Sequence, residues 1–214
     1  MELLRLIETI RTPFLEFAAG LVTRLGEETV AVVVLCAVFW CINKRAAYGI
    51  GVAFFFSGLT VQGMKVCFRI ERPWVADPSL RPVASAMDKA TGYSFPSGHT
   101  QCAAALFGSL GVQTKRKTAR ALCFSAVLLV AFSRVYLGVH TPLDVVASLL
   151  VSSLFILLTA KLISGETTGK KAELVVALAM AAFAVIVIAV AAGMYSAGKI
   201  GHDYVADYVF TELF

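Results

Sequence analysis

Residues 46–68 read AAYGIGVAFFFSGLTVQGMKVCF, and this stretch decides the fold class. It contains no charged side chain before Lys65, which lies near its end. A helix that spans the hydrocarbon core of a bilayer needs about 20 predominantly apolar residues. The stretch therefore predicts a transmembrane helix.

The composition of the whole chain agrees with a membrane protein. Of the 214 residues, 58% are apolar and 15% are charged, and a soluble core of this size cannot bury so many apolar side chains. A nucleic-acid-binding domain, a secreted disulfide scaffold and a disordered chain are therefore disfavoured, although the net charge is +5. The five cysteines lie in or beside apolar runs without a CxxC or Cys/His pattern, which is typical of small hydrophobic residues.

Other stretches of the chain have the same apolar character. Four reach the roughly 17 to 25 residues of a spanning helix: 97–113, 119–137, 142–163 and 173–195. A further stretch, 28–43, is at the short end; its uninterrupted apolar part, 29–42, could by itself form a re-entrant segment, and only the charge pattern below favours a span.

Residues 1–25 have a different pattern. Charges recur every few positions and apolar residues return at roughly helical spacing, which predicts an amphipathic interfacial helix, broken or bent at Thr12-Pro13. This helix either lies on the membrane or packs within the bundle. We therefore predict an all-α, polytopic membrane helical bundle with about six transmembrane helices plus the N-terminal amphipathic helix, in a single domain over residues 1–214.

The charges predict an orientation. With six spans, three short connections fall on one side, and they carry nine basic and two acidic residues, a balance of +7. The remaining ten basic and twelve acidic residues give −2 on the other side. By the positive-inside rule the basic connections are cytoplasmic, so the loop 69–96 and the turn 138–141 lie on the outer face.

Ionisable residues gather at the outer ends of the spans. Lys65 and Arg72 are seven residues apart, close to two helical turns, so they share a helix face with Arg69 between them. Snorkelling of these side chains to the lipid headgroups explains them equally well. Because charged groups at membrane depth are costly, they are candidates for function.

The stretch Phe95-Pro-Ser-Gly-His-Thr100 opens the next span. Ser97 suits an N-cap, Gly98 allows a ligand to approach the backbone, and the free amides of the first turn favour an anion. His99 could then exchange a proton with that anion. Taken alone, the stretch also fits a plain helix start with an unrelated histidine.

The third group surrounds the turn between two spans. Arg134 lies near the end of an apolar run, where a permanent cation needs an anionic partner. His140 and Asp144 are four residues apart, so the carboxylate can reach an imidazole nitrogen. Thr141 to Asp144 also fits a capping box with proline at the first helical position, which does not exclude catalysis.

These residues form patterns that resemble a known family. KVCFRIERP (65–73), PSGH (96–99) and SRVYLGVHTPLD (133–144) are similar to Kx6RP, PSGH and SRx5Hx3D, the signature motifs of the type 2 phosphatidic acid phosphatase (PAP2) superfamily. All three match without a substitution and in the right order. The resemblance implies a membrane phosphatase acting on lipid phosphate monoesters or polyprenyl diphosphates, of the phosphatidic acid, phosphatidylglycerophosphate or undecaprenyl diphosphate type.

The resemblance also implies roles for the matching positions. His140 would attack phosphorus and form a phosphohistidine, and Asp144 would fix its tautomer. His99 would protonate the leaving group and then activate water. The nonbridging oxygens would be held by a phosphate-binding set: Lys65, Arg72, Ser97, Gly98 and Arg134.

The same comparison implies no metal and no cofactor. Asp144 is the only acidic residue at a signature position, so no carboxylate cluster for Mg²⁺ is expected. Arg69 is outside the signatures and could contact a lipid headgroup. We predict an integral protein of a bacterial inner membrane with its site on the outer face.

The alternative is a protein that binds or transports a phospholipid or polyprenyl phosphate without hydrolysing it. Such a protein needs the cations but has little use for a nucleophile, a carboxylate placed to orient it and a second histidine. The sequence does not distinguish a phosphate monoester from a diphosphate, and it leaves the oligomeric state open.

Overall fold

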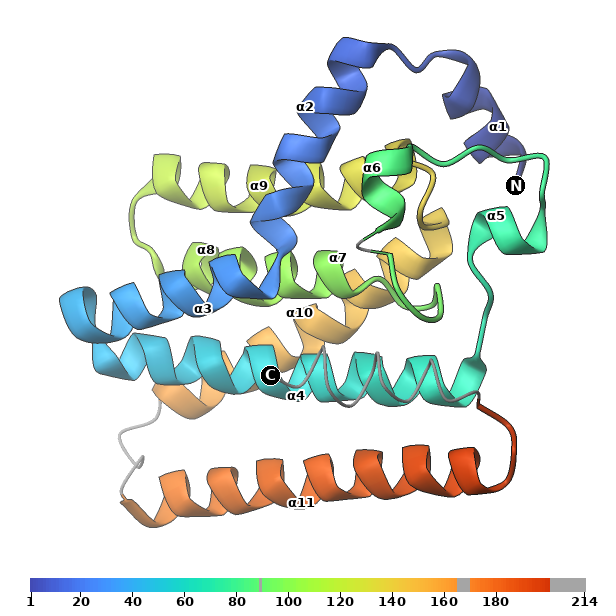
Figure 1. Cartoon of the computed structure of the whole chain (residues 1–214). Helices are drawn as coiled ribbons and strands as arrows, with labels where there is room; N and C mark the ends of the chain where they lie inside the picture. The colour runs from blue at the N-terminus through green and yellow to red at the C-terminus, as the bar shows by residue number, and fades with distance from the viewer. Residues whose placement is uncertain (89, 165–169, 201–214) are drawn as a thin grey trace.

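The computed structural model describes residues 1–88, 90–164 and 170–200, and it is helical (Figure 1). The α-helices are α1 (Glu2–Thr9), α2 (Pro13–Thr23), α3 (Glu28–Ala37), α4 (Lys44–Phe68), α5 (Pro73–Ala76), α6 (Ala84–Met87), α7 (Gly98–Ala103), α8 (Ser109–Gln113), α9 (Lys117–Tyr136), α10 (Pro142–Ser164) and α11 (Lys170–Ser196). A 3-10 turn, η1 (Arg24–Gly26), and two π-helical turns, η2 (Val38–Ile42) and η3 (Ala104–Gly108), complete the described elements. The all-α prediction is confirmed.

Fewer helices than six are long enough to span a membrane. Four qualify among the described residues, and they contain α4, α9, α10 and α11. The predicted span 97–113 forms α7, η3 and α8 in direct succession. This helical run extends only from Gly98 to Gln113, which is shorter than the 18 residues required of a candidate span. The count of six is therefore approximate, whereas the membrane-helix class is correct.

The N-terminal segment differs in part from the predicted interfacial helix. The break at Thr12-Pro13 is confirmed, since the Thr12 side chain caps α2 and Pro13 occupies its first turn. Both α1 and α2 pack against α9. Residues 13–26 and 28–42 together are apolar enough for a span but bend by 52°, as in a broken span or a re-entrant segment.

The connections between helices lie at two opposite ends of the bundle, in the two groups that the charge pattern predicted. In Figure 1 the links α3–α4 and α8–α9 lie at one end of the bundle, where α10 ends and α11 begins. The loop between α4 and α7 and the turn between α9 and α10 lie toward the opposite end. The basic connections therefore share one end of the molecule, and the signature motifs face the other.

The loop 69–96 is structured rather than extended. It contains α5 and α6, and its buried Ala86 and Ala90 pack against Leu137 and Val139 in the turn after α9. The Val83 amide also donates to the Leu137 carbonyl at 3.0 Å. These contacts place the loop directly over the turn that carries His140.

Helix α1 contacts the loop 69–96 through an ion pair at the surface. The Arg5 guanidinium pairs with the Asp77 carboxylate at 2.6 Å. Hydrogen bonds from the Ser79 side chain and from Arg5 lower the pKa of Asp77 to about 2. The carboxylate is thus ionised at any pH well above 2, and the pairing is lost only as the pH falls through that value.

Candidate active site

The structure brings the eight predicted catalytic and phosphate-binding residues to one end of the bundle. They come from the end of α4, the following loop, the start of α7, the end of α9, the turn after it and the start of α10. Six of them expose no more than 6% of their surface: Lys65, Arg72, Ser97, Arg134, His140 and Asp144. Buried cations are costly unless an anion or a set of acceptors compensates them, so the cluster is suited to a negatively charged ligand.

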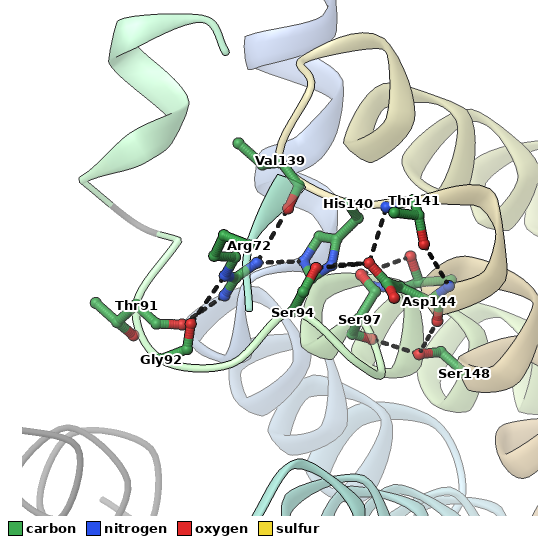
Figure 2. Close-up of polar contacts among 11 residues, drawn as sticks. Arg72, Thr91, Gly92, Ser94, Ser97, Val139, His140, Thr141, Asp144 and Ser148 are labelled. Atoms are coloured by element: carbon green, nitrogen blue, oxygen red, sulfur yellow. Dashed lines mark hydrogen bonds and ion pairs between the residues drawn. The ribbon is translucent and has the colours of Figure 1, made fainter. Parts of the chain in front are cut away.

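Asp144 has both of the roles that the sequence left open. Its Oδ2 atom accepts a hydrogen bond from the Thr141 amide at 2.8 Å, while the Asp144 amide donates to Thr141 Oγ1 at 3.3 Å, which completes the capping box of α10. The same Oδ2 atom lies 3.3 Å from His140 Nδ1 and accepts from Ser94 Oγ at 2.6 Å (Figure 2). The carboxylate that starts the helix therefore also orients the imidazole.

Arg72 lies on the opposite side of that imidazole (Figure 2). Its guanidinium donates to the carbonyls of Gly92 at 3.0 Å and Val139 at 3.2 Å, and to that of Thr91. Its NH1 atom is 2.9 Å from His140 Nε2. A guanidinium has only donors, so Nε2 must accept and the proton of a neutral ring lies on Nδ1, facing the carboxylate. This tautomer leaves the Nε2 lone pair directed toward the cation-lined site.

The surroundings of His140 keep it uncharged. Burial, followed by the charges of Arg72, Arg134 and Lys65, lowers its pKa well below the usual value. An imidazole that is neutral at pH 7 is a nucleophile, whereas the imidazolium is not. Burial and the three cations therefore act together to keep this imidazole free of a proton.

The start of α7 provides the second part of the anion site. Ser97 caps the helix by accepting from the Thr100 amide at 3.4 Å, and its own amide donates to the Asp144 carbonyl at 3.2 Å. A Cβ added at Gly98 would lie 3.7 Å from Lys65 Nζ. The glycine thus keeps the space beside that ammonium open to a ligand.

Arg134 and His99 line a neighbouring cavity of about 460 Å³. The Arg134 NH1 atom donates to Thr23 Oγ1 at 3.0 Å. Within the described part of the chain, Arg134 Nε and His99 Nε2 are buried and have no hydrogen-bond partner. Buried polar atoms without a partner are rare, so these two are suited to a ligand that enters the cavity.

Two site residues were not predicted from the sequence. Ser94 stands three positions before Ser97, and its place beside a motif was the only available signal. Thr23 is 111 positions from Arg134, and nothing in the sequence relates them. Arg69 lies outside the cluster, at the exposed end of α4, where its guanidinium donates to the Lys199 carbonyl at 3.4 Å.

The described residues contain no group of three or more His, Cys, Asp or Glu side chains placed to hold a metal ion. The cluster instead consists of cations, two imidazoles, helix amides and one carboxylate. Together, the fold and this site define an integral membrane protein with a cation-lined cluster, suited to a phosphate-sized anion, beside a buried and oriented histidine.

Comparison with known families agrees with this class. The family described as the PAP2 superfamily matches residues 46–168, more than half of the chain. The chain belongs to this superfamily.

Solved structures show the same fold. The chain is similar to LpxE from Aquifex aeolicus, with a TM-score of 0.66 and 26% identity, over 75% of this chain and 93% of that one. It is also similar to a transmembrane PAP2-type phosphatidylglycerolphosphate phosphatase from Bacillus subtilis, with a TM-score of 0.65 and 21% identity, over 78% and 84% of the two chains.

Two curated relatives are similar in sequence. An undecaprenyl-diphosphatase from Sulfolobus acidocaldarius is 39% identical over 100 residues, which cover 44% of this chain and 45% of that protein. A "Probable sphingosine-1-phosphate phosphatase" from Dictyostelium discoideum is 29% identical over 170 residues, or 72% and 40% of the two chains. The aligned parts thus span less than half the length of either relative.

Proposed function

We propose that this protein is a membrane phosphatase that hydrolyses lipid phosphate monoesters or polyprenyl diphosphates through a phosphohistidine. One observation carries the proposal: His140 has its Nδ1 atom against Asp144 and its Nε2 atom against Arg72. A site that only binds phosphate gains nothing from an imidazole held in one tautomer between a carboxylate and a cation. The relatives, which are named as phosphatases of several lipid phosphates, support the same class.

The reaction follows from the placement of these groups. The phosphoryl group binds among Lys65, Arg72 and Arg134, and His140 Nε2 attacks phosphorus while the bond to the leaving oxygen breaks. Asp144 accepts a hydrogen bond from Nδ1–H and balances the positive charge that develops on the ring. His99 takes up a proton when the bound anionic substrate offsets the surrounding cations, and it donates that proton to the leaving alkoxide or phosphate.

The second half of the reaction returns the enzyme to its starting state. His99, now neutral, takes a proton from a water molecule, and the hydroxide attacks the phosphohistidine. The bond between phosphorus and Nε2 breaks, inorganic phosphate leaves, and His99 is again protonated. Neither half needs a metal ion.

The charge pattern of the connections supports placing the site on the outer face of the membrane, since the basic connections lie at the opposite end. We further propose that this membrane is a bacterial inner membrane. The apolar faces of the spanning helices would lie in the bilayer and the lipid tail between them. Arg69, exposed at the rim, would contact a lipid headgroup.

The test uses purified protein in detergent micelles with EDTA present. We expect phosphate release from phosphatidic acid or from a polyprenyl diphosphate, and loss of at least about 10³-fold of that activity in His140→Ala. Activity close to wild type in this variant would refute the nucleophile. Loss of wild-type activity in EDTA would refute the metal-free route.

Trapping the intermediate separates the two histidines. With p-nitrophenyl phosphate, whose leaving group needs no proton, His99→Ala should still accumulate acid-labile label from [³²P] substrate, whereas His140→Ala should not. Binding of lipid phosphates without any release or labelling would instead show a binding protein or transporter.

A further inference from the structure

The cavity next to Arg134 and His99 has a charge pattern that the catalytic cycle leaves unexplained. Three further charged residues line it: Glu16 on α2, Arg24 in η1 and Glu27 at the bend between η1 and α3. The other described residues of its lining are uncharged and include Pro13, Phe17 and Leu21 of α2. Beyond the phosphate site itself, the cavity therefore contains two carboxylates and one guanidinium, a balance of −1.

Glu27 is held in place at this bend. Its amide donates to the Arg24 carbonyl at 3.0 Å, and its carbonyl accepts from the Ala31 amide at 3.2 Å. The residue is half-buried, and its charge interacts with that of Arg134. The backbone of Glu27 is thus held at the cavity that Arg134 also lines, and the residue does not belong to any of the three signature motifs.

The leaving group of the proposed reaction must lie toward this cavity. The reacting phosphoryl group contacts Lys65 and Arg72 on the side of His140, and the oxygen that leaves takes its proton from His99, which lines the cavity. In a monoester, that oxygen is followed by a carbon chain. In a diphosphate, it belongs to a second phosphate, whose single negative charge rises toward two as the bond breaks and would lie near the carboxylates.

We propose that Glu27, assisted by Glu16, is a specificity-determining residue that makes this enzyme select lipid phosphate monoesters over lipid diphosphates. The inference rests on the proposed phosphatase function and deepens it. Like charges brought together in a water-poor site are strongly unfavourable, and Arg24 offsets only one of the two carboxylates. A carboxylate that lines the cavity on the side of the leaving group thus disfavours the second phosphate more than it weakens binding of the first.

The experiment compares two substrates that differ by one phosphate, namely dioleoyl phosphatidic acid and dioleoylglycerol pyrophosphate. Initial rates of substrate loss are measured in the same detergent micelles for the wild-type protein, Glu27→Gln and Glu28→Gln. Glu28 is the matched control, because it is exposed, adjacent in sequence and outside the cavity lining. Glutamine keeps the size and the backbone role of the residue at the helix start while removing its charge.

The wild-type protein should have the higher kcat/KM for phosphatidic acid. In Glu27→Gln the ratio of kcat/KM for diphosphate to that for monoester should rise by about tenfold, chiefly through the KM of the diphosphate. Glu28→Gln should leave both values unchanged.

Three results would overturn the inference while leaving the phosphatase proposal intact: a wild-type preference for the diphosphate, an equal change for both substrates in Glu27→Gln, or the same change of ratio in Glu28→Gln. If the wild-type protein hydrolyses neither substrate nor any other lipid phosphate, the proposed function itself fails. The two failures are therefore distinguishable.

Discussion

Substituting Asp144 by asparagine tests how the charge of one carboxylate supports the nucleophile. Asparagine has nearly the same shape, and its amide oxygen can still accept from the Thr141 amide and the Ser94 hydroxyl, which now bond Oδ2 at 2.8 and 2.6 Å. The capping of α10 therefore survives, and we expect the free energy of unfolding to change by less than about 1 kcal/mol. What the substitution removes is the negative charge beside His140.

The size of the effect follows from the distance between the two groups. Asp144 Oδ2 lies 3.3 Å from His140 Nδ1. At an effective dielectric constant of about 20, a full positive charge at that distance is stabilised by about 5 kcal/mol, and a half-developed charge by roughly half as much. We therefore expect a barrier higher by about 2 to 5 kcal/mol, which corresponds to a kcat lower by about 30- to 5,000-fold.

The assay is phosphate release at saturating substrate, together with thermal unfolding in the same detergent. Asp88→Asn is the control, because it removes a carboxylate from an exposed position at the end of α6, and it should keep wild-type kcat. Asp144→Ala should lose stability as well, by about 1 to 3 kcal/mol, since the hydrogen-bond donors lose their acceptor. A kcat within threefold of wild type in Asp144→Asn, with normal unfolding, would refute the electrostatic role.

Three further predictions concern the surroundings of the site. Gly26→Ala should destabilise the protein by about 1 to 3 kcal/mol in thermal unfolding. The added Cβ would lie 2.5 Å from the His99 carbonyl oxygen, a backbone atom that cannot rotate away. Unchanged stability would contradict this contact. Thr23→Val should lower kcat/KM by about tenfold, since it removes the hydroxyl that accepts from Arg134; an unchanged value would show that the arginine needs no such support. Because burial and nearby cations lower the pKa of His140, the acid limb of the pH profile of kcat/KM should lie below pH 6.5. An acid limb at about pH 6.5 would contradict this, because it is the result expected for a histidine whose pKa is not shifted.

Much of the fold was predictable because membrane helices are determined by length and apolarity. The run 46–68 corresponds closely to α4, and the stretch 119–137 to α9. The bend between α2 and α3 was not predictable, because it depends on Gly26 approaching the start of α7 so closely that a side chain does not fit. That contact joins segments more than 70 positions apart, and the spacing of apolar residues along the sequence does not indicate such a contact.

The site divides in the same way between local and distant relations. The pairing of His140 with Asp144 was predictable from a spacing of four at a helix start. The partners of Arg72 were not, since its guanidinium is held by the carbonyls of Thr91, Gly92 and Val139, and backbone acceptors have no signature in the sequence. Side-chain identities thus predicted the chemical groups of the site, whereas the fold decides how they are held.

The site also depends on the segment that precedes the matched family region, 46–168. Thr23 holds Arg134 at 3.0 Å, and Arg11 donates to the Tyr136 carbonyl at 2.9 Å and to the Arg81 carbonyl. A Cβ on Gly138, whose φ is +76°, would lie 2.5 Å from Arg11 NH2, so the turn that leads to His140 is shaped around this guanidinium. The three motifs contain the groups that we propose to react. The first 27 residues, in turn, hold Arg134, shape the turn that leads to His140 and add the charges of the neighbouring cavity. Because these residues lie outside the motifs, the motifs alone do not determine the charge of the cavity beside the site.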